Sequence, residues 1–391
     1  MRRAKRYYKR SESGVPRYAA LMDPIDPRHL PPMPELMIAG PGQLHDEDLG
    51  VLGEQLIAHY GDVWVQLHND TVAAVGRLVK AKDPPYVVPG TGTTCLDAAA
   101  MNLFEPGQTV VVARTGFFGE RLHEVAEANG LNVVDVEVPL GEAADPAVLG
   151  ETASREGAAG VLVTQVDTST GVRHPIKEIA RAAHDAGALI MVDGIASVGG
   201  ELCDVDGWGI DCLVSSTQKG MESPPGLGIL ALGTRGRARV ELRSQRPPSW
   251  YLDLKRWDWY RENWPWHPHP VTMPSPLVLS LLSSLNRILE VGLEKWVAQR
   301  AALASRCREG LASIGLEPVA HEDVQANMIV AAYADDATDI VPFVLKEGIQ
   351  ISGGLAPLAG KTIRVGLMGR TANEKMVDRV IDAIARARKE R

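Results

Sequence analysis

The chain has 391 residues, 45% of them hydrophobic and 23% charged, and its formal net charge is −8. This length suits two domains, and the acidic balance gives no reason to expect a nucleic-acid partner. No apolar run approaches the roughly 20 residues of a membrane-spanning helix, so we expect no membrane partner either.

The cysteine pattern indicates reduced thiols. Cysteines occur at positions 95, 203, 212 and 307. None forms a CxxC pair, and the spacing of Cys203 and Cys212 is too wide for a structural zinc knuckle. We therefore predict four mostly buried free thiols in a cytoplasmic protein, and no metal site.

The N-terminal segment 1–35 is basic and then proline-rich. Its first ten residues, MRRAKRYYKR, carry six basic side chains, but acids and prolines follow, unlike a mitochondrial targeting segment. We expect an N-terminal arm, either packed on a partner subunit or a disordered tail.

From residue 36 to 274, apolar strands alternate with amphipathic helices. Strands are predicted at 86–90, 109–115, 131–138, 158–166, 188–193 and 210–216, with helices at 93–104, 119–130 and 175–187. This alternation predicts an α/β domain with a mainly parallel sheet covered on both faces. Right-handed crossovers then place the carboxyl ends of the strands along one edge of the sheet.

The pattern changes after residue 274. A long helical region at 275–315 precedes strands at 327–333 and 362–368, with helices at 337–348 and 373–390. We predict a smaller α+β domain over 275–391. The preceding segment, 249–274, holds five of the eight tryptophans, which is typical of an interface, a pocket rim or a small satellite core.

A phosphate cup is predicted where the first strand meets its helix. Thr91, Gly92 and Thr93 supply hydroxyl and backbone N–H groups at a helix N-terminus, although a threonine-capped helix uses the same residues. The stretch also begins a GxGxxG pattern. Cys95 replaces its third glycine, and the next strand ends in Arg114 where a dinucleotide site needs an acid.

Two further strand ends carry chemistry. Asp193 ends a buried strand, and Lys219 follows the next strand in the loop SSTQKGMESPPGLG. Alone, these residues would be a turn-forming acid and a surface lysine. Together with the cup they offer pyridoxal 5′-phosphate (PLP) a phosphate cradle, a partner for the pyridine nitrogen and a Schiff-base amine.

With these residues in place, the sequence resembles the class V (subgroup IV) PLP-dependent aminotransferases, in particular the alanine–glyoxylate/serine–pyruvate group. The resemblance runs from Leu36 to Ala387. It rests on AGPG (39–42), GTGTTCLDAAAMNLFEPGQ (90–108), GFFGERLHEVAEANG (116–130), DTSTGVRHPI (167–176), MVDGIASVGG (191–200), GIDCLVSSTQKGMESPPGLG (209–228), SWYLDLKRW (249–257) and ISGGLAPLAGKTIRVGLMG (351–369).

The resemblance implies a fold-type I protein, with a seven-stranded sheet in the large domain 36–274, and a homodimer with shared active sites. It implies that Lys219 forms the Schiff base, Asp193 pairs with the pyridine nitrogen and Gln218 helps to bind phosphate. Ile195 and Phe118 would cover the two faces of the cofactor ring.

Other positions follow from the same resemblance. Thr168 would lie close to the cofactor, Thr272 would reach the phosphate in the partner subunit, and Arg364 would hold the substrate carboxylate. The chain departs from the family pattern at His269, where many relatives have a tyrosine three residues before the phosphate-binding threonine. The resemblance implies that His269 could still donate a hydrogen bond to the cofactor. The chain departs again after Gly42, where Gln43 replaces a proline at the substrate-side turn.

The expected reaction is transamination from a small amino acid, alanine or serine, to glyoxylate or pyruvate by a ping-pong mechanism. Pyridoxamine–pyruvate and ureidoglycine–glyoxylate transaminases are alternatives that differ only in the substrate pocket. A PLP-binding protein without activity is a further alternative. The segment 350–360 has no cysteine, which argues against a cysteine desulfurase.

Overall fold

The computed structural model describes residue 30 and residues 32–389. The chain divides into two units, Met1–Pro34 and Glu35–Arg391, and all the described helices and strands belong to the second. The predicted arm therefore lies almost entirely outside the described residues.

A seven-stranded sheet forms the centre of the first part of this unit, with the strand order β2-β10-β9-β8-β5-β3-β4. The strands are β2 Tyr86–Pro89, β3 Thr109–Arg114, β4 Asn132–Glu137, β5 Gly160–Thr164, β8 Leu189–Asp193, β9 Cys212–Ser216 and β10 Leu227–Leu232. Only β10 runs antiparallel to its neighbours. The predicted mainly parallel sheet is confirmed, and β10 is the one strand absent from the six predicted.

The central strands are buried on both faces. Every residue of β5, β9 and β10 is buried, as a parallel sheet covered by helices requires. The helices packed on the sheet are α3 Gly92–Leu103, α4 Phe117–Ala128, α5 Pro146–Glu156, α6 Ile176–Asp185 and α7 Thr234–Leu242. A single large apolar cluster joins these helices to the strands.

Helices outside this sheet layer complete the cluster. They are α2 Asp62–Val79, α8 Leu254–Asn263 and α9 Ser275–Val291. The short helix α1 Asp46–Leu52 packs against α9. The long helical region predicted at 275–315 is two helices, because Gly292 at φ +88° separates α9 from α10 Leu293–Ser313. No single described helix is long and apolar enough to cross a membrane. α9 and α10 would qualify only as a pair, and the chain bends by 90° between them.

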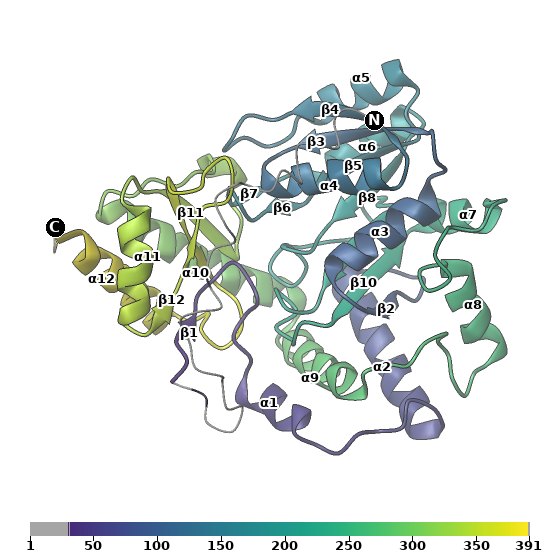
Figure 1. The fold of residues 1–391 in the computed structure, drawn as a ribbon, viewed down its shortest axis with the longest axis horizontal. Helices are drawn as coiled ribbons and strands as arrows, with labels where there is room; N and C mark the ends of the chain where they lie inside the picture. The colour runs from purple at the N-terminus through teal and green to yellow at the C-terminus, as the bar shows by residue number, and fades with distance from the viewer. Residues whose placement is uncertain (1–29, 31, 390–391) are drawn as a thin grey trace, which may run out of the picture. The chain divides into compact units, whose positions relative to one another are not determined.

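A second apolar cluster lies in the C-terminal part. It joins α10 to β11 Ile329–Tyr333, α11 Ala337–Lys346, β12 Ile349–Gln350, β14 Thr362–Gly366 and α12 Glu374–Lys389. The short strand β13 Ser352–Gly353 pairs with β14. Figure 1 shows α11 and α12 beside β11 and β12. The short strand β1 Glu35–Leu36 pairs with β12, so the N-terminal end of this unit joins its C-terminal sheets. The domain boundary at 274/275 stays a prediction.

Candidate active site

A pocket of about 310 Å³ lies at the carboxyl ends of the sheet strands and brings together most of the predicted site residues. It is lined by Thr91, Gly92, Thr93, Phe118, Thr168, Asp193, Ile195, Gln218, Lys219 and Arg364, together with Ala39, Gly40, Leu96, Arg121, Ser352 and Leu355. Two other pockets of the described structure are larger, but neither contains Lys219 or Asp193.

Lys219 stands three residues beyond β9 with its side chain against apolar neighbours. Its Nζ lies 5.4 Å from the centroid of the Phe118 ring, and a Cβ added to Gly40 would meet its side-chain carbons at 3.0 Å. Burial lowers the pKa of Lys219 from 10.5 to about 8, although the negative charge of Asp193 opposes this shift. The amine is therefore much easier to deprotonate than an exposed lysine.

Asp193 is the last residue of β8 and is almost completely buried. Its Oδ1 accepts a hydrogen bond of 2.9 Å from the backbone N–H of Ile195, and Oδ2 has no hydrogen-bond partner among the described residues. Burial raises the pKa of Asp193 to about 6, against the opposing effect of the Lys219 charge. A protonated ring nitrogen placed beside this carboxylate would favour its ionised form.

The N-terminus of α3 forms the predicted cup. Thr91 caps the helix, and its side chain and that of Thr94 each accept a backbone N–H from the other residue. The N–H groups of Gly92 and Thr93 lie in the first turn, where no intrahelical carbonyl is available to them. A Cβ at Gly92 would stand 2.4 Å from Cδ1 of Ile195, so a larger residue here would displace the Ile195 side chain.

Phe118 is held by the buried carboxylate of Asp167. Oδ2 of Asp167 accepts the backbone N–H groups of Phe118, at 3.0 Å, and of Gly119, at 3.3 Å. Its Oδ1 accepts the N–H and hydroxyl of Ser169. Asp167 thus supplies the N-terminal acceptors that α4 lacks, since Gly116 has no capping side chain.

Arg364, on β14, reaches the pocket from the C-terminal sheet. Its Nε donates to the carbonyl of Gly353 at 2.9 Å, and Nη1 donates to the carbonyl of Thr168 at 3.1 Å. The side chain is 6% exposed and forms no ion pair with any described acid. A buried guanidinium bonded only to carbonyls is a strong site for an incoming carboxylate.

A buried carboxylate connects the Lys219 turn to distant parts of the chain. Glu222, at φ +54°, follows Lys219 by three residues. It accepts hydrogen bonds from Arg300 at 2.7 Å and from the N–H of Gly369 at 2.8 Å, and it pairs with His45 at 3.1 Å. Burial alone would raise the pKa of Glu222, but the His45 hydrogen bond and the Arg300 charge lower it below its usual value.

Three predicted residues lie outside the pocket wall. Gly42 donates its N–H to the carbonyl of Gln218 at 2.8 Å, so it holds the backbone next to Lys219 and does not line the pocket. The side chain of Gln43 accepts the N–H of Leu36 at 2.7 Å, which places it beside β1 and not toward the pocket. Thr272 is exposed on this chain.

The structure places His269 away from the pocket as well. The residue is fully buried, its Nε2 accepts from Trp64 Nε1 at 2.8 Å, and its Nδ1 donates to the carbonyl of Val271 at 2.7 Å. Burial and three neighbouring imidazoles lower its pKa to about 3, so the ring is neutral. Both nitrogens are engaged within the chain, in contrast to the free donor that the sequence suggested.

Sequence reasoning missed Arg121, Asp167 and Glu222. Arg121 lines the pocket from α4, three residues after Phe118, and helical spacing places such residues on one face. Asp167 immediately precedes the predicted Thr168, so it could also have been found. Nothing local marks Glu222, since its partners Arg300 and Gly369 are 78 and 147 residues away.

Comparisons with known proteins identify the family of this chain. The family model described as "Aminotransferase class-V" matches residues 53–380. This chain is a class V aminotransferase. Because the family catalyses PLP-dependent transamination, the predicted reaction class is confirmed.

Individual relatives cover almost the whole chain. The alanine–glyoxylate aminotransferase of Felis catus is 30% identical, over 91% of this chain and 88% of that protein. The crystal structure of alanine–glyoxylate aminotransferase from Nostoc sp. is similar with a TM-score of 0.89 and 26% identity, covering 93% of this chain and 97% of that one. Ureidoglycine–glyoxylate aminotransferase from Bacillus subtilis has a TM-score of 0.88 and 25% identity, covering 93% and 94%.

Two buried polar atoms, one from the pocket wall and one from a residue next to Gly92, have no partner in this chain and suit the family's cofactor. Oε1 of Gln218 and Oγ of Ser216 are buried with no hydrogen-bond partner among the described residues. A 180° rotation of the Gln218 amide presents its NH₂ group at the same place, and the Ser216 hydroxyl can donate. With the free N–H groups of α3, these donors fit a phosphate.

We expect Glu222→Ala to destabilise the protein and to weaken the hold on Lys219, because it leaves the buried guanidinium of Arg300 unpaired. The loss in unfolding free energy should be about 3–5 kcal/mol, measured by urea denaturation. Glu222→Gln keeps an acceptor and should recover part of it. The matched control Glu294→Gln removes an exposed acid paired with Lys80 and should have little effect. If Glu222→Ala unfolds at the same urea concentration as the control Glu294→Gln, Glu222 does not have this role.

We also expect Lys219 to react with a trace acylating reagent as an amine of pKa about 8. The protonated amine is not nucleophilic, so labelling of the Lys219 peptide, followed by mass spectrometry, should rise with pH around a midpoint of about 8 and then level off. Asp193→Asn removes the charge that raises this pKa, so its midpoint should move to lower pH. The exposed control Asp185→Asn should leave it unchanged. A midpoint near 10.5 would contradict the assignment.

Proposed function

We propose that this aminotransferase moves the amino group of alanine or serine to glyoxylate or pyruvate, using PLP held beside Lys219. The observation that carries the proposal is the meeting of Lys219, Asp193 and Arg364 in one pocket of about 310 Å³. PLP-dependent transamination of an α-amino acid uses an amine for the Schiff base, a carboxylate for the pyridine nitrogen and a guanidinium for the substrate carboxylate. The guanidinium must not already be paired with an acidic side chain.

The residues that would hold the cofactor come from separate strand ends. The α3 N-terminus, with Thr91, Gly92 and Thr93, would take the phosphate together with Gln218. Asp193 would keep the pyridine nitrogen protonated, and Phe118 and Ile195 would enclose the ring. When bound, PLP supplies an electron sink that stabilises negative charge at the substrate Cα.

Lys219 would serve as the general base. Its pKa of about 8 leaves an appreciable neutral fraction near pH 7, so Nζ can accept the Cα proton and return it to an adjacent carbon. The nearby carboxylate of Asp193 limits how far burial lowers this pKa. The hydrogen bond from Gly42 to the Gln218 carbonyl and the Glu222 contacts would keep the amine in place during these transfers.

Arg364 would orient the substrate by its carboxylate. Two of its N–H groups are committed to the carbonyls of Gly353 and Thr168, which fixes the plane of the guanidinium and leaves the rest of the fork for the ligand. The pocket is at the small end of ligand sites, about 300–1,000 Å³. Since it must hold the cofactor too, it favours a short side chain such as that of alanine or serine.

A homodimer is part of the proposal. Thr272 is exposed and lies outside the pocket of its own chain, which suits a residue that reaches the phosphate of a partner subunit. Sedimentation of the purified protein as a monomer would remove this part of the proposal.

The second candidate is ureidoglycine as the amino donor. It is favoured by the similarity to the Bacillus subtilis ureidoglycine–glyoxylate aminotransferase and by Arg121, a second guanidinium in the pocket wall. The polar ureido group of such a donor would find a hydrogen-bond donor in Arg121 that alanine does not use.

The deciding experiment is the visible absorption spectrum of the PLP-loaded protein during titration with L-alanine, L-serine, ureidoglycine or pyridoxamine. We expect alanine or serine to bleach the band and glyoxylate or pyruvate to restore it. Bleaching by ureidoglycine alone would favour the second candidate, and bleaching by pyridoxamine alone would indicate a pyridoxamine–pyruvate transaminase. A band that no donor changes would mean that the protein binds PLP without activity.

Arg364→Lys should raise KM for every α-carboxylate substrate by about tenfold or more, because a point charge cannot replace a bidentate fork. The turnover number should fall less. Steady-state kinetics with alanine and with serine measure both parameters. Arg308→Lys, an arginine outside the pocket that bonds the Ala326 carbonyl, is the matched control. An unchanged KM in Arg364→Lys would place the carboxylate site elsewhere.

A further inference from the structure

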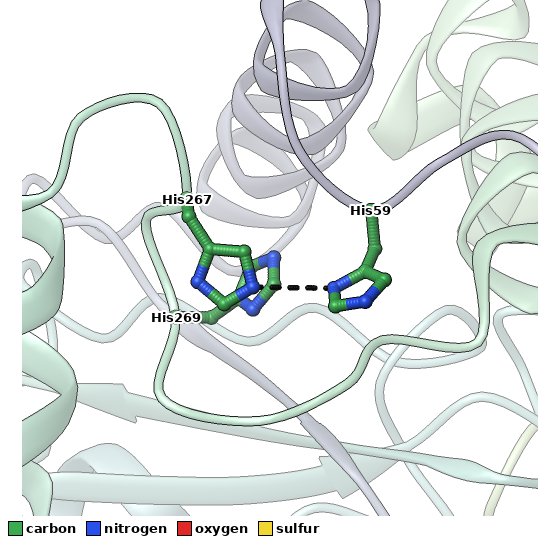
Figure 2. Close-up of side chains that lie close together, drawn as sticks. All are labelled: His59, His267 and His269. Carbon is green, nitrogen blue, oxygen red and sulfur yellow. Dashed lines mark hydrogen bonds between the residues drawn. The ribbon is translucent and has the colours of Figure 1, made fainter.

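Three histidines from two distant segments meet outside the pocket. His59 lies in the loop between α1 and α2, whereas His267 and His269 lie in the loop between α8 and α9. One ring nitrogen from each lies within 4.8 Å of the other two. Figure 2 shows the rings of His267 and His269 next to each other and His59 facing them from the opposite loop. Sequence reasoning predicted no metal site, because His267 and His269 stand in a proline-rich loop without nearby acids and His59 is 208 residues from His267.

The closest pair already has the separation of two metal ligands. Nε2 of His267 and Nδ1 of His59 are 3.2 Å apart. Two nitrogens bound tetrahedrally to one Zn²⁺, each at about 2.0–2.1 Å, lie about 3.3 Å from each other. In this structure the two nitrogens share one proton in a hydrogen bond. At the same separation, both nitrogens could instead direct a lone pair at one cation.

The third ring is in the tautomer that binds metal. Nδ1 of His269 donates to the Val271 carbonyl, so Nε2 carries the lone pair. A backbone carbonyl that fixes the ring in this way is a common second partner of a metal-bound histidine. Nε2 currently accepts the Trp64 N–H, which a cation would displace.

The surroundings limit which cation fits. No described acid forms an ion pair with the three rings, so the ligand set is neutral imidazole. Nδ1 of His267 is buried with no hydrogen-bond partner among the described residues, so the chain does not satisfy this ring by itself. Neutral imidazoles suit Zn²⁺, Cu²⁺ and Ni²⁺ rather than Mg²⁺ or Ca²⁺, which need oxygen ligands.

The loops are also stiff enough to keep the rings together. Pro265, Pro268 and Pro270 restrict the backbone around His267 and His269. The N–H of Gly61 donates to the carbonyl of Trp266 at 3.1 Å and joins the two loops next to the rings. Little ordering therefore remains to be done on binding.

We propose that His59, His267 and His269 form a binding site for one Zn²⁺ ion, with the fourth position open to water. The ion would connect the loop before α2 to the loop that carries Thr272. It would act on structure, since none of its ligands lines the pocket of Lys219.

The test uses untagged, full-length, PLP-loaded protein freed of metal with a chelator. Isothermal titration with Zn²⁺ and visible spectroscopy with Co²⁺ report affinity, stoichiometry and coordination. We expect one ion per chain, a tetrahedral Co²⁺ spectrum, and a loss of affinity of at least about tenfold in both His59→Ala and His267→Ala. Zn²⁺ should raise the melting temperature of the wild type but not of the double variant.

His321→Ala, which removes an exposed histidine elsewhere, is the matched control and should bind as the wild type does. The PLP absorption band of each variant verifies that its fold is intact. The proposal is wrong if the His59→Ala/His267→Ala protein binds Zn²⁺ as tightly as the wild type, or if the wild type binds none at micromolar concentrations.

Discussion

The double-sided burial of the central strands determines where this protein can carry chemistry. β5 and β9 are covered on both faces, so a polar side chain within either strand is removed from water and needs a partner inside the protein. Polar groups are therefore found where the strands end. Because β8 and β9 pair in parallel, with Asp193 opposite Val214, Asp193 and the lysine turn emerge at the same edge. The pocket is a consequence of that alignment.

The same burial also sets the electrostatics of the pocket. Loss of water raises the pKa of Asp193 and lowers that of Lys219, and the charge of each limits the shift of the other. The pKa values of Asp193 and Lys219, about 6 and about 8, therefore lie on either side of neutral pH. Arg364 adds a positive charge that forms no ion pair with a described acid, which favours an anionic ligand in the pocket.

The sequence was sufficient where a feature depends on neighbours in the chain. Apolar runs predicted β5, β8 and β9, and the residues that follow them gave Asp193 and Lys219. β10 was missed because its short run, LGILAL, follows the lysine loop directly, with no helix to mark it. The break between α9 and α10 depends on Gly292, which a helical pattern tolerates.

Features that depend on residues far apart in the sequence could not be predicted from the sequence alone. Glu222 has the local character of a turn residue, and only the fold brings Arg300, Gly369 and His45 to it. The same is true of His269, whose ring is satisfied by Trp64 from α2. Gln43 was expected near the substrate from its position beside Gly42, but a backbone N–H near β1 takes its side chain. Local sequence does not reveal such competition for hydrogen bonds.

The pairing of β1 with β12 has a consequence for biosynthesis. The segment around Gly40 packs against the Lys219 side chain, yet it is anchored through Glu35 to Ile349 and through Gln43 to Gly369. A chain emerging from the ribosome therefore presents the first wall of the lysine site early, but can fix it only after the C-terminal strands have been translated. The large sheet is free to form before that moment. The wall of the lysine site is thus completed only after the last strands of the chain have been made.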